Sequence, residues 1–130
     1  MKILTSLTVA LFFALNAFSN NIQINNVNLT GQILANQYTL IEFDLSWENS
    51  WRIDVGPSNW DAAWIFVKYR VSGGVWKHAS LNYVNGSAAS DGHTEAGGST
   101  ISTPSDGRGV FIYRSATGSG DVNFAGTRLR

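Results

Sequence analysis

The chain has 130 residues, a formal net charge of zero, five tryptophans and no cysteine. This length suits one domain with a single core, and the neutral balance gives no electrostatic reason to bind nucleic acid or an anionic membrane. Without cysteine, packing rather than disulfide bonds must stabilise the fold. The 13 glycines and 2 prolines favour short strands joined by tight turns.

The first 19 residues have the pattern of a secretory signal peptide. Lys2 is followed by an apolar, uncharged run at residues 3–15, and Ala17-Phe18-Ser19 places small residues where a signal peptidase cleaves. The run is too short for a membrane span. We therefore expect residues 1–19 to be removed, residues 20–130 to form one exported domain, and the mature chain to have no transmembrane segment. The expected location is extracellular or periplasmic.

Residues 20–48 predict two strands. In the first, the phase of the apolar residues changes between Ile24 and Val27, so an edge strand with a bulge at Asn25-Asn26 is expected, followed by a loop at residues 31–37. Residues 38–48 alternate more regularly. Their apolar members should face a core: Ile41, Phe43, Leu45 and Trp47. Their polar members should face water: Glu42, Asp44, Ser46 and Glu48.

Strands at residues 63–71 and 75–83 should form a hairpin around Ser72-Gly73-Gly74. A two-residue loop would place Arg70 opposite Lys77, an unfavourable pair of like charges, whereas a three-residue loop pairs Val71 with Val75. With the three-residue loop, one face should be core: Ile65, Val67, Tyr69, Ala79, Leu81 and Tyr83. The other face mixes aromatic, basic and polar side chains: Trp64, Phe66, Lys68, Arg70, Trp76, His78, Ser80 and Asn82.

The rest of the chain predicts strands and loops, and no segment of the mature chain has a helical period. Residues 85–105 should be mostly loop with a short strand at 99–102, residues 109–114 a strand that is apolar on both sides, and residues 122–129 a final strand. We expect an all-β antiparallel sandwich, jelly-roll or immunoglobulin-like, of about seven to eight strands. Its expected core residues are Phe43, Leu45, Trp47, Ile65, Val67, Tyr69, Leu81, Phe111 and Ile112.

The aromatic and basic face of the hairpin is the candidate binding site. Exposed aromatic side chains usually contact a ligand or a partner, and aromatic rings beside hydrogen-bonding groups can stack on a sugar or receive another domain. A structural alternative is that Arg70 lies over Trp76 in a cation–π contact and a loop covers the remainder. The candidate binding residues are Trp64, Phe66, Lys68, Arg70, Trp76, His78 and Asn82.

Metal sites are weakly indicated, and no cofactor is expected. His78 and His93 are the only imidazoles, too few for a zinc site. Calcium is the better candidate, because Asp91, Asp106 and Asp121 lie in glycine-rich loops. Aspartates beside glycine also simply form turns, which is the alternative interpretation.

Catalysis would have to use the carboxylates Glu42, Asp44 and Glu48 on one strand face. A flat strand provides no desolvated cleft to raise the pKa of one of them. We expect them instead to form exposed ion pairs with Lys68 and Arg70. No serine lies in a Gly-x-Ser-x-Gly elbow, so the sequence predicts a protein that is not an enzyme.

Several motifs together resemble one family. They are FDLSWENSWR, NWDAAWIFVKYRV, Trp76-x-His78, the Gly92-His93 loop and DGRGVFIYR, followed by a Gly-x-Gly turn and a terminal RLR. In this order, from about Ile22 to Arg130, they are similar to the N-terminal β-domain of secreted bacterial proteins with a downstream formylglycine-generating-enzyme-like (sulfatase-modifying factor) domain.

The resemblance implies an exported accessory module whose Trp64 and Trp76 face docks a neighbouring enzyme-like domain. It also implies that the final strand is cut, since in the family the chain continues past this point with further β segments. Catalysis does not carry over, because those enzymes use cysteines of the downstream domain. The alternative hypothesis is a stand-alone lectin-like module that binds a surface glycan through the same face.

Overall fold

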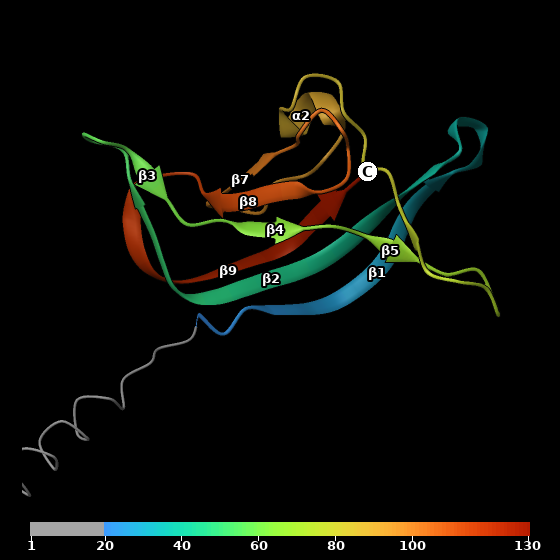
Figure 1. Cartoon of the computed structure of the whole chain (residues 1–130), viewed down its shortest axis with the longest axis horizontal. Coiled ribbons are helices and arrows are strands. Elements are labelled where there is room, and N and C mark those ends of the chain that lie inside the picture. Colours follow the sequence, from blue (N-terminus) through green and yellow to red (C-terminus); the bar gives the residue numbers. More distant parts are fainter. Residues whose placement is uncertain (1–19) are drawn as a thin grey trace, which may run out of the picture.

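The computed structural model describes residues 20–130, and the predicted signal peptide at residues 1–19 lies outside the described residues. The elements shown in Figure 1 are β1 (Gln23–Ile33), η1 (Leu34–Asn36), β2 (Tyr38–Ile53), β3 (Asn59–Trp60), β4 (Ala63–Ile65), β5 (Lys68–Tyr69), β6 (Lys77–His78), α2 (Ala88–Asp91), β7 (Ser99–Ser102), β8 (Val110–Arg114) and β9 (Gly118–Leu129). Every pairing between these strands is antiparallel. The predicted all-β sandwich is confirmed.

Strand β2 is the centre of the larger sheet. It pairs with β1 along one side and with β9 along the other, and the short β3 pairs near its end. Ile41 of β2, for example, is the register partner of both Leu29 in β1 and Leu129 in β9. The period of two gives β2 one apolar face, on which Phe43 and Leu45 are fully covered, as the sequence predicts.

A smaller sheet of order β4-β8-β7 packs over this apolar face and lies above β2 and β9 in Figure 1. The core between the two sheets consists of buried apolar residues: Phe43, Leu45, Trp47, Ala63, Ile65, Leu81, Ala88, Ala96, Ile101, Val110, Ile112, Val122, Phe124 and Leu129. Trp47 and Phe124 meet edge to face with ring centroids 5.4 Å apart. Burial of such side chains is the main stabilising term available to a chain without disulfides.

The core prediction is wrong for Tyr69 and Phe111, which are 46% and 42% exposed, and Val67 is only half-buried. Phe111 faces outward because its neighbours Val110 and Ile112 in β8 take the inner face. Tyr69 belongs to β5, which continues past the end of β4 and out of the sandwich. The apolar pattern of a strand does not reveal how far the opposite sheet extends.

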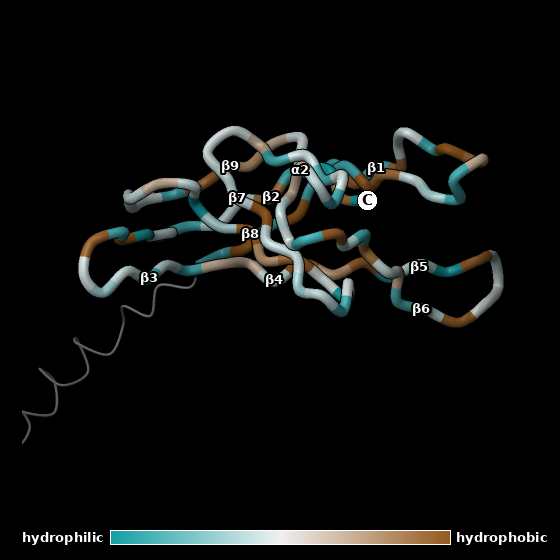
Figure 2. Tube along the Cα trace, turned by 90° about the horizontal axis from the view of Figure 1, so that it is seen from above, coloured by the Kyte–Doolittle hydropathy of each residue, from teal (hydrophilic) through white to brown (hydrophobic). Residues whose placement is uncertain are grey.

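The β5–β6 hairpin has the predicted three-residue turn. Lys68 pairs with His78 and Tyr69 with Lys77, a register that places Arg70 opposite Trp76. Gly73 has a φ of +71°, in the left-handed region that glycine adopts most easily. Figure 2 shows this hairpin and the β1–β2 hairpin projecting at the same end of the molecule, each with apolar segments near its tip.

Other element boundaries differ from the prediction. The bulge in β1 is confirmed as a register shift between Asn25 and Asn28, but β1 extends to Ile33, into the expected loop at residues 31–37, where η1 follows it. The expected strand at residues 63–71 is divided into β4 and β5, the expected strand at residues 75–83 is reduced to β6, and β9 begins at Gly118, before its expected start at residue 122. The one-turn helix α2 in the expected loop was not predicted, because four residues carry no helical periodicity.

Candidate interaction surface

The structure divides the predicted aromatic and basic face into three contacts. Trp64 packs against Phe111 of β8, with ring centroids 4.6 Å apart. Phe66 packs against His78 at 5.5 Å, and the Lys68 ammonium lies 5.8 Å from the Phe66 ring. At the tip, the Arg70 guanidinium lies 5.2 Å from the Trp76 ring, as the structural alternative proposed. Five of these residues, Phe66, Lys68, Arg70, Trp76 and His78, form what we call the hairpin surface.

The aromatic rings of this region are open to solvent. Trp76 is 62% exposed and Phe66 is 47% exposed, and the two valines that flank the turn, Val71 and Val75, are also exposed. Internal stacking therefore covers only part of each ring. An aromatic surface of this kind is typical of a contact site.

Two predicted site residues have separate structural settings. The Asn82 side chain donates a hydrogen bond of 2.7 Å to the Asp91 carbonyl, so it fixes the loop around α2 and does not join the hairpin surface. Trp64 rests on Gly109: a Cβ at this position would lie 2.5 Å from the indole ring and 2.7 Å from the Ile65 carbonyl oxygen. Glycine at position 109 thus allows Trp64 to lie flat against β8.

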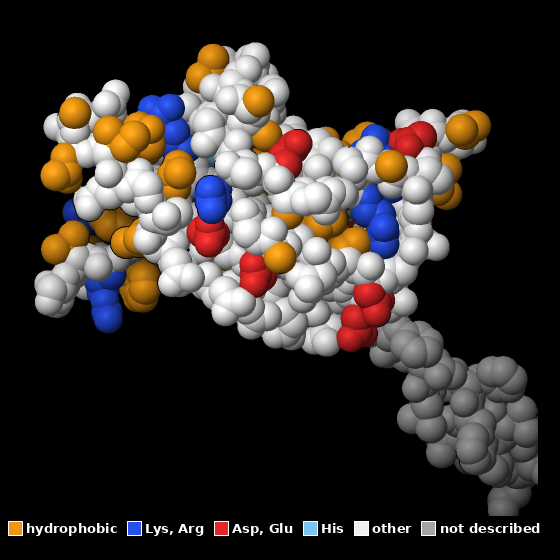
Figure 3. All heavy atoms as spheres, turned by 180° about the vertical axis from the view of Figure 1, so that it is seen from behind, with side chains coloured by type: hydrophobic (Ala, Val, Ile, Leu, Met, Phe, Trp, Pro, Cys, Tyr) orange, Lys and Arg blue, Asp and Glu red, His pale blue; other side chains and the backbone are white. Residues whose placement is uncertain are grey.

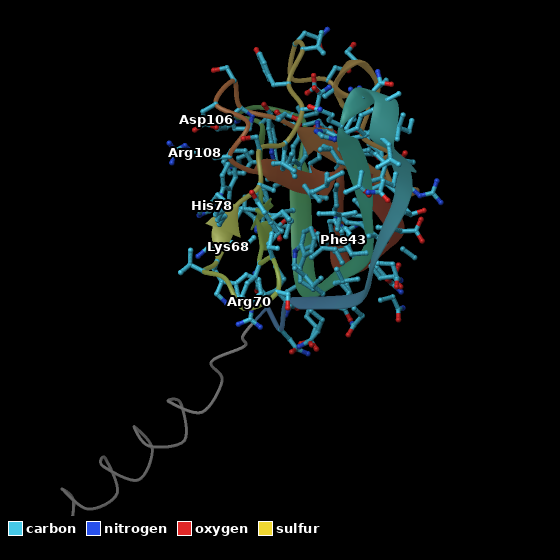
Figure 4. All side chains as sticks on the ribbon, turned by 90° about the vertical axis from the view of Figure 1, so that its right-hand side faces the viewer. Phe43, Lys68, Arg70, His78, Asp106 and Arg108 are labelled. Carbon is cyan, nitrogen blue, oxygen red and sulfur yellow. The ribbon has the colours of Figure 1, made fainter. Side chains whose placement is uncertain are left out.

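A groove with a volume of about 410 Å³ lies beside the hairpin surface. We call it the edge groove, and its lining comes from β1 and β2 on one wall and residues 65–69 on the other: Ile24, Val27, Asn28, Leu29, Ile41, Phe43, Ile65, Phe66, Val67, Lys68 and Tyr69. Figure 4 looks onto this end of the domain, where Phe43 on β2 and Lys68 on β5 are labelled. Sequence reasoning missed the groove, because the apolar residues that line it also read as core.

The charges near the groove are unbalanced. Lys68, Arg70 and Lys77 form no ion pair with any residue that the structure describes, and the sequence has no acidic residue between Asp61 and Asp91. On the face seen in Figure 3, the end with the two hairpins carries basic and apolar side chains, and the acidic ones lie elsewhere. The neutral total therefore conceals a local excess of positive charge.

The predicted ion pairs of β2 with Lys68 and Arg70 are wrong, because the neighbours of β2 are β1 and β9 rather than the hairpin. Glu42 instead pairs with Arg128 of β9, and Glu48 accepts a hydrogen bond of 2.9 Å from Asn21. These carboxylates form contacts between strands on an outer sheet face.

Asp44, on the same face of β2, also joins strands. It accepts hydrogen bonds from the Asn26 side chain at 2.7 Å and the Gly126 N–H at 2.8 Å. These bonds hold the pKa of Asp44 below its usual value. The three carboxylates proposed for catalysis thus each have a structural partner.

The three aspartates considered for calcium lie in different settings. The buried Asp91 accepts hydrogen bonds from the N–H groups of Val84, Asn85 and Gly86. Although burial opposes its ionisation, these donors hold the Asp91 pKa below its usual value. The remaining two candidates accept backbone N–H groups, Asp106 from Arg108 and Asp121 from Asn49. Within residues 20–130 no group of three or more His, Cys, Asp or Glu side chains could hold a metal ion.

His93 is the second imidazole and is buried near Asp91. Its Nδ1 accepts a hydrogen bond of 3.1 Å from the Arg130 N–H, and its Nε2 is buried without a partner among the described residues. Burial lowers the pKa of His93, Asp91 opposes this effect, and the Arg130 charge adds to it. The neutral ring is therefore the form that fits this site.

A polar network centred on Asp61 was missed by sequence reasoning. Asp61 accepts hydrogen bonds from the Trp47 indole, the Ser50 hydroxyl and the Trp51 N–H. Arg114 in turn donates to the Ser50 hydroxyl at 3.1 Å. Only the pairing of distant strands brings these groups together, so the network ties the far end of the sandwich.

A second cluster lies next to this network. Arg52 lies over Trp60 at 4.8 Å and over Tyr113 at 5.6 Å, and the two aromatic rings stack on each other at 5.5 Å. Arg52 also forms an ion pair with Asp54. These contacts pack Trp60 of β3 against Arg52 of β2 and Tyr113 of β8.

In the described part of the chain, no helix is both long and apolar enough to span a membrane. Comparison of the chain with protein-family models, with curated proteins and with solved structures finds no match.

Proposed function

We propose that this chain is an exported, non-catalytic accessory domain that binds another polypeptide through the hairpin surface and the edge groove beside it. The observation that carries the proposal is the position of the apolar groove directly next to unpaired basic residues. Apolar grooves of a few hundred Å³ with a few polar groups at the rim are the usual form of a binding site. Here Lys68 lines the groove, and Arg70 follows it two residues later on the hairpin, outside the groove lining.

Exposure of the tip supports a contact role over a purely structural one. A hairpin that only stabilised the sandwich would bury its largest side chains against it, but Trp76 and Val75 are 62% and 75% exposed. Tryptophan and arginine are also the residues that contribute most to protein interfaces. The Arg70–Trp76 pair thus has the composition of an interface centre.

The resemblance seen in the sequence motifs supplies one candidate partner, a downstream domain of the formylglycine-generating-enzyme type. In this interpretation the reaction belongs to the partner, and the β-sandwich positions or stabilises it. The edge groove and the hairpin surface would then lie between the two domains.

A glycan is the second candidate ligand, because Trp64 and Phe111 form an exposed aromatic pair on the outer face of the smaller sheet. Sugars stack on such rings when polar groups lie nearby. The lining of the edge groove is mostly apolar and offers few hydrogen-bonding groups to a sugar. A polypeptide partner therefore accounts for more of the surface than a glycan does.

Site-specific photocrosslinking in the producing cell tests the proposal. A photoreactive amino acid replaces Trp76 in one variant and Val55 in another, since Val55 is 84% exposed and lies outside the groove lining. We expect a discrete protein adduct at position 76 and none at position 55. Equal crosslinking at both positions, or none at either, would contradict a specific polypeptide contact.

A further inference from the structure

The edge groove is bordered on one side by β1, a sheet edge that has no second strand partner in the part of the chain that the structure describes. Among the described residues, β1 pairs only with β2, and β4 pairs only with β8. The opposite wall consists of Ile65, at the end of β4, and of residues 66–69, of which Lys68 and Tyr69 belong to β5 and pair with β6. The groove is therefore the open side of an incompletely covered sandwich.

An open sheet edge accepts a further strand. Its unpaired N–H and C=O groups are a template for pairing with another chain, and proteins usually cover or interrupt such edges. Strand β1 keeps an alternating apolar face next to the groove, with Val27 61% exposed and Leu29 75% exposed. An added strand could pair through its backbone and insert every second side chain into the groove.

The groove also indicates the charge of the added strand. Lys68 lines it, and its ammonium lies 5.8 Å from the centroid of the Phe66 ring. Because no described carboxylate pairs with Lys68, a carboxylate of the incoming strand would complete the contact. A ligand without backbone amides would leave the β1 edge unpaired, and a ligand without a carboxylate would leave the Lys68 ammonium unpaired.

Resting on the proposed function, we propose that the edge groove binds an extended strand of the partner polypeptide, apolar at alternate residues and carrying an aspartate or glutamate beside Lys68. The strand pairs with the free edge of β1 and faces residues 65–69 across the groove. Backbone pairing provides affinity, the groove selects alternate apolar side chains, and Lys68 selects the acidic position.

Fluorescence anisotropy with a labelled synthetic peptide tests this inference. The probe has roughly eight residues, the length of an ordinary strand, alternates valine with threonine and carries one central glutamate. We expect saturable binding to the purified protein, and no binding of a peptide with the same side chains but N-methylated backbone amides on both edges. Equal binding of the methylated peptide would show that the groove takes apolar groups without strand pairing, which overturns the proposal.

Matched protein variants locate the contact. Val27→Gln should weaken binding about tenfold, because it removes apolar area from the groove wall. Val84→Gln is the control and should leave binding unchanged, since both valines are 61% exposed and only Val27 lines the groove.

The second pair of variants tests the charge. Lys68→Gln should abolish an about two- to fivefold preference of the protein for the glutamate probe over its glutamine analogue. Lys77→Gln, on the same hairpin but outside the groove lining, should keep that preference. Equal effects of the two members of either pair would overturn the proposal.

Two further outcomes separate this inference from the proposed function. If the Trp76 crosslink forms but no peptide binds, the chain contacts a polypeptide without accepting a strand, and only the strand proposal fails. If sedimentation shows a dimer that the probe dissociates, the natural occupant is a second copy, which also overturns the proposal. If a peptide binds but no crosslink forms at Trp76, the groove accepts a strand, and the proposed polypeptide contact of the hairpin surface fails.

Discussion

The carboxylate of Asp61 accepts a hydrogen bond of 2.7 Å from the indole N–H of Trp47, a core side chain that is only 4% exposed. The same carboxylate accepts the hydroxyl of the buried Ser50 at 3.0 Å. Asp61 thus satisfies polar groups that the packing of the sandwich has removed from water. Leaving such groups without partners is costly.

We expect Asp61→Ala to lower the free energy of unfolding by about 1–3 kcal/mol, because the buried donors of Trp47 and Ser50 lose their acceptor. Urea unfolding followed by circular dichroism measures the change. Asp106→Ala is the control, since Asp106 is exposed and accepts only one local N–H, and it should cost less than about 0.5 kcal/mol. Equal costs would show that the network does not stabilise the fold.

Truncation of Leu45 should show where the core lies. Leu45 is fully buried and Leu34 is 79% exposed, so Leu45→Ala should cost about 2–5 kcal/mol and Leu34→Ala less than about 0.5 kcal/mol. Denaturant unfolding of the two variants gives the comparison. A large loss from Leu34→Ala would mean that the tip of the first hairpin is covered in solution.

Stability should fall in mildly acidic solution because of His93. Its pKa is lowered in the folded protein, so below about pH 6.5 the unfolded chain binds a proton that the folded chain does not, and unfolding becomes more favourable. Above that pH the ring is neutral in both states and the effect disappears. Protonation would also remove the Nδ1 acceptor used by the Arg130 N–H.

Thermal unfolding between about pH 7 and pH 5 tests this effect above the range in which ordinary carboxylates titrate. His93→Gln should reduce the loss of stability across this range. The control His78→Gln changes an exposed ring on the hairpin and should keep the loss found in the parent. An unchanged loss in His93→Gln would assign the pH dependence to another group.

Gly109→Ala should destabilise the protein by about 1–3 kcal/mol and displace Trp64, since the new methyl group would meet the indole and the Ile65 carbonyl oxygen. Near-ultraviolet circular dichroism would report the altered tryptophan environment. Gly97→Ala is the matched control, because an added Cβ there meets nothing within 4 Å. If both variants keep the parent spectrum and stability, Trp64 is not held by Gly109.

The double variant Trp64→Ala, Trp76→Ala distinguishes the glycan hypothesis from the polypeptide proposal. Both rings are partly exposed, at 40% and 62%, so we expect the variant to fold and its glycan-column retention to equal that of the parent. The matched control removes Trp51 and Trp60, which are 39% and 41% exposed at the other end of the sandwich. Retention that is lost only in the Trp64 and Trp76 variant would favour the lectin-like module.

The sequence by itself determined the all-β class, the phase of β2 and the turn of the β5–β6 hairpin. These features depend on local rules: side chains alternate along a strand, so Phe43 and Leu45 share a face, and Gly73 supplies the positive φ of the turn. The Arg70–Trp76 contact follows from the same register. Each of these inferences needed only residues close together in the chain.

Tertiary structure alone decided which side chains the second sheet covers and which groups meet across strands. Tyr69 has the alternating pattern of a core residue but lies beyond the smaller sheet, so it lines a groove. Glu42 meets Arg128 because β9 returns beside β2. Strand order and sheet extent arise from contacts between distant segments, and the period of two is the same for a covered strand and an open one.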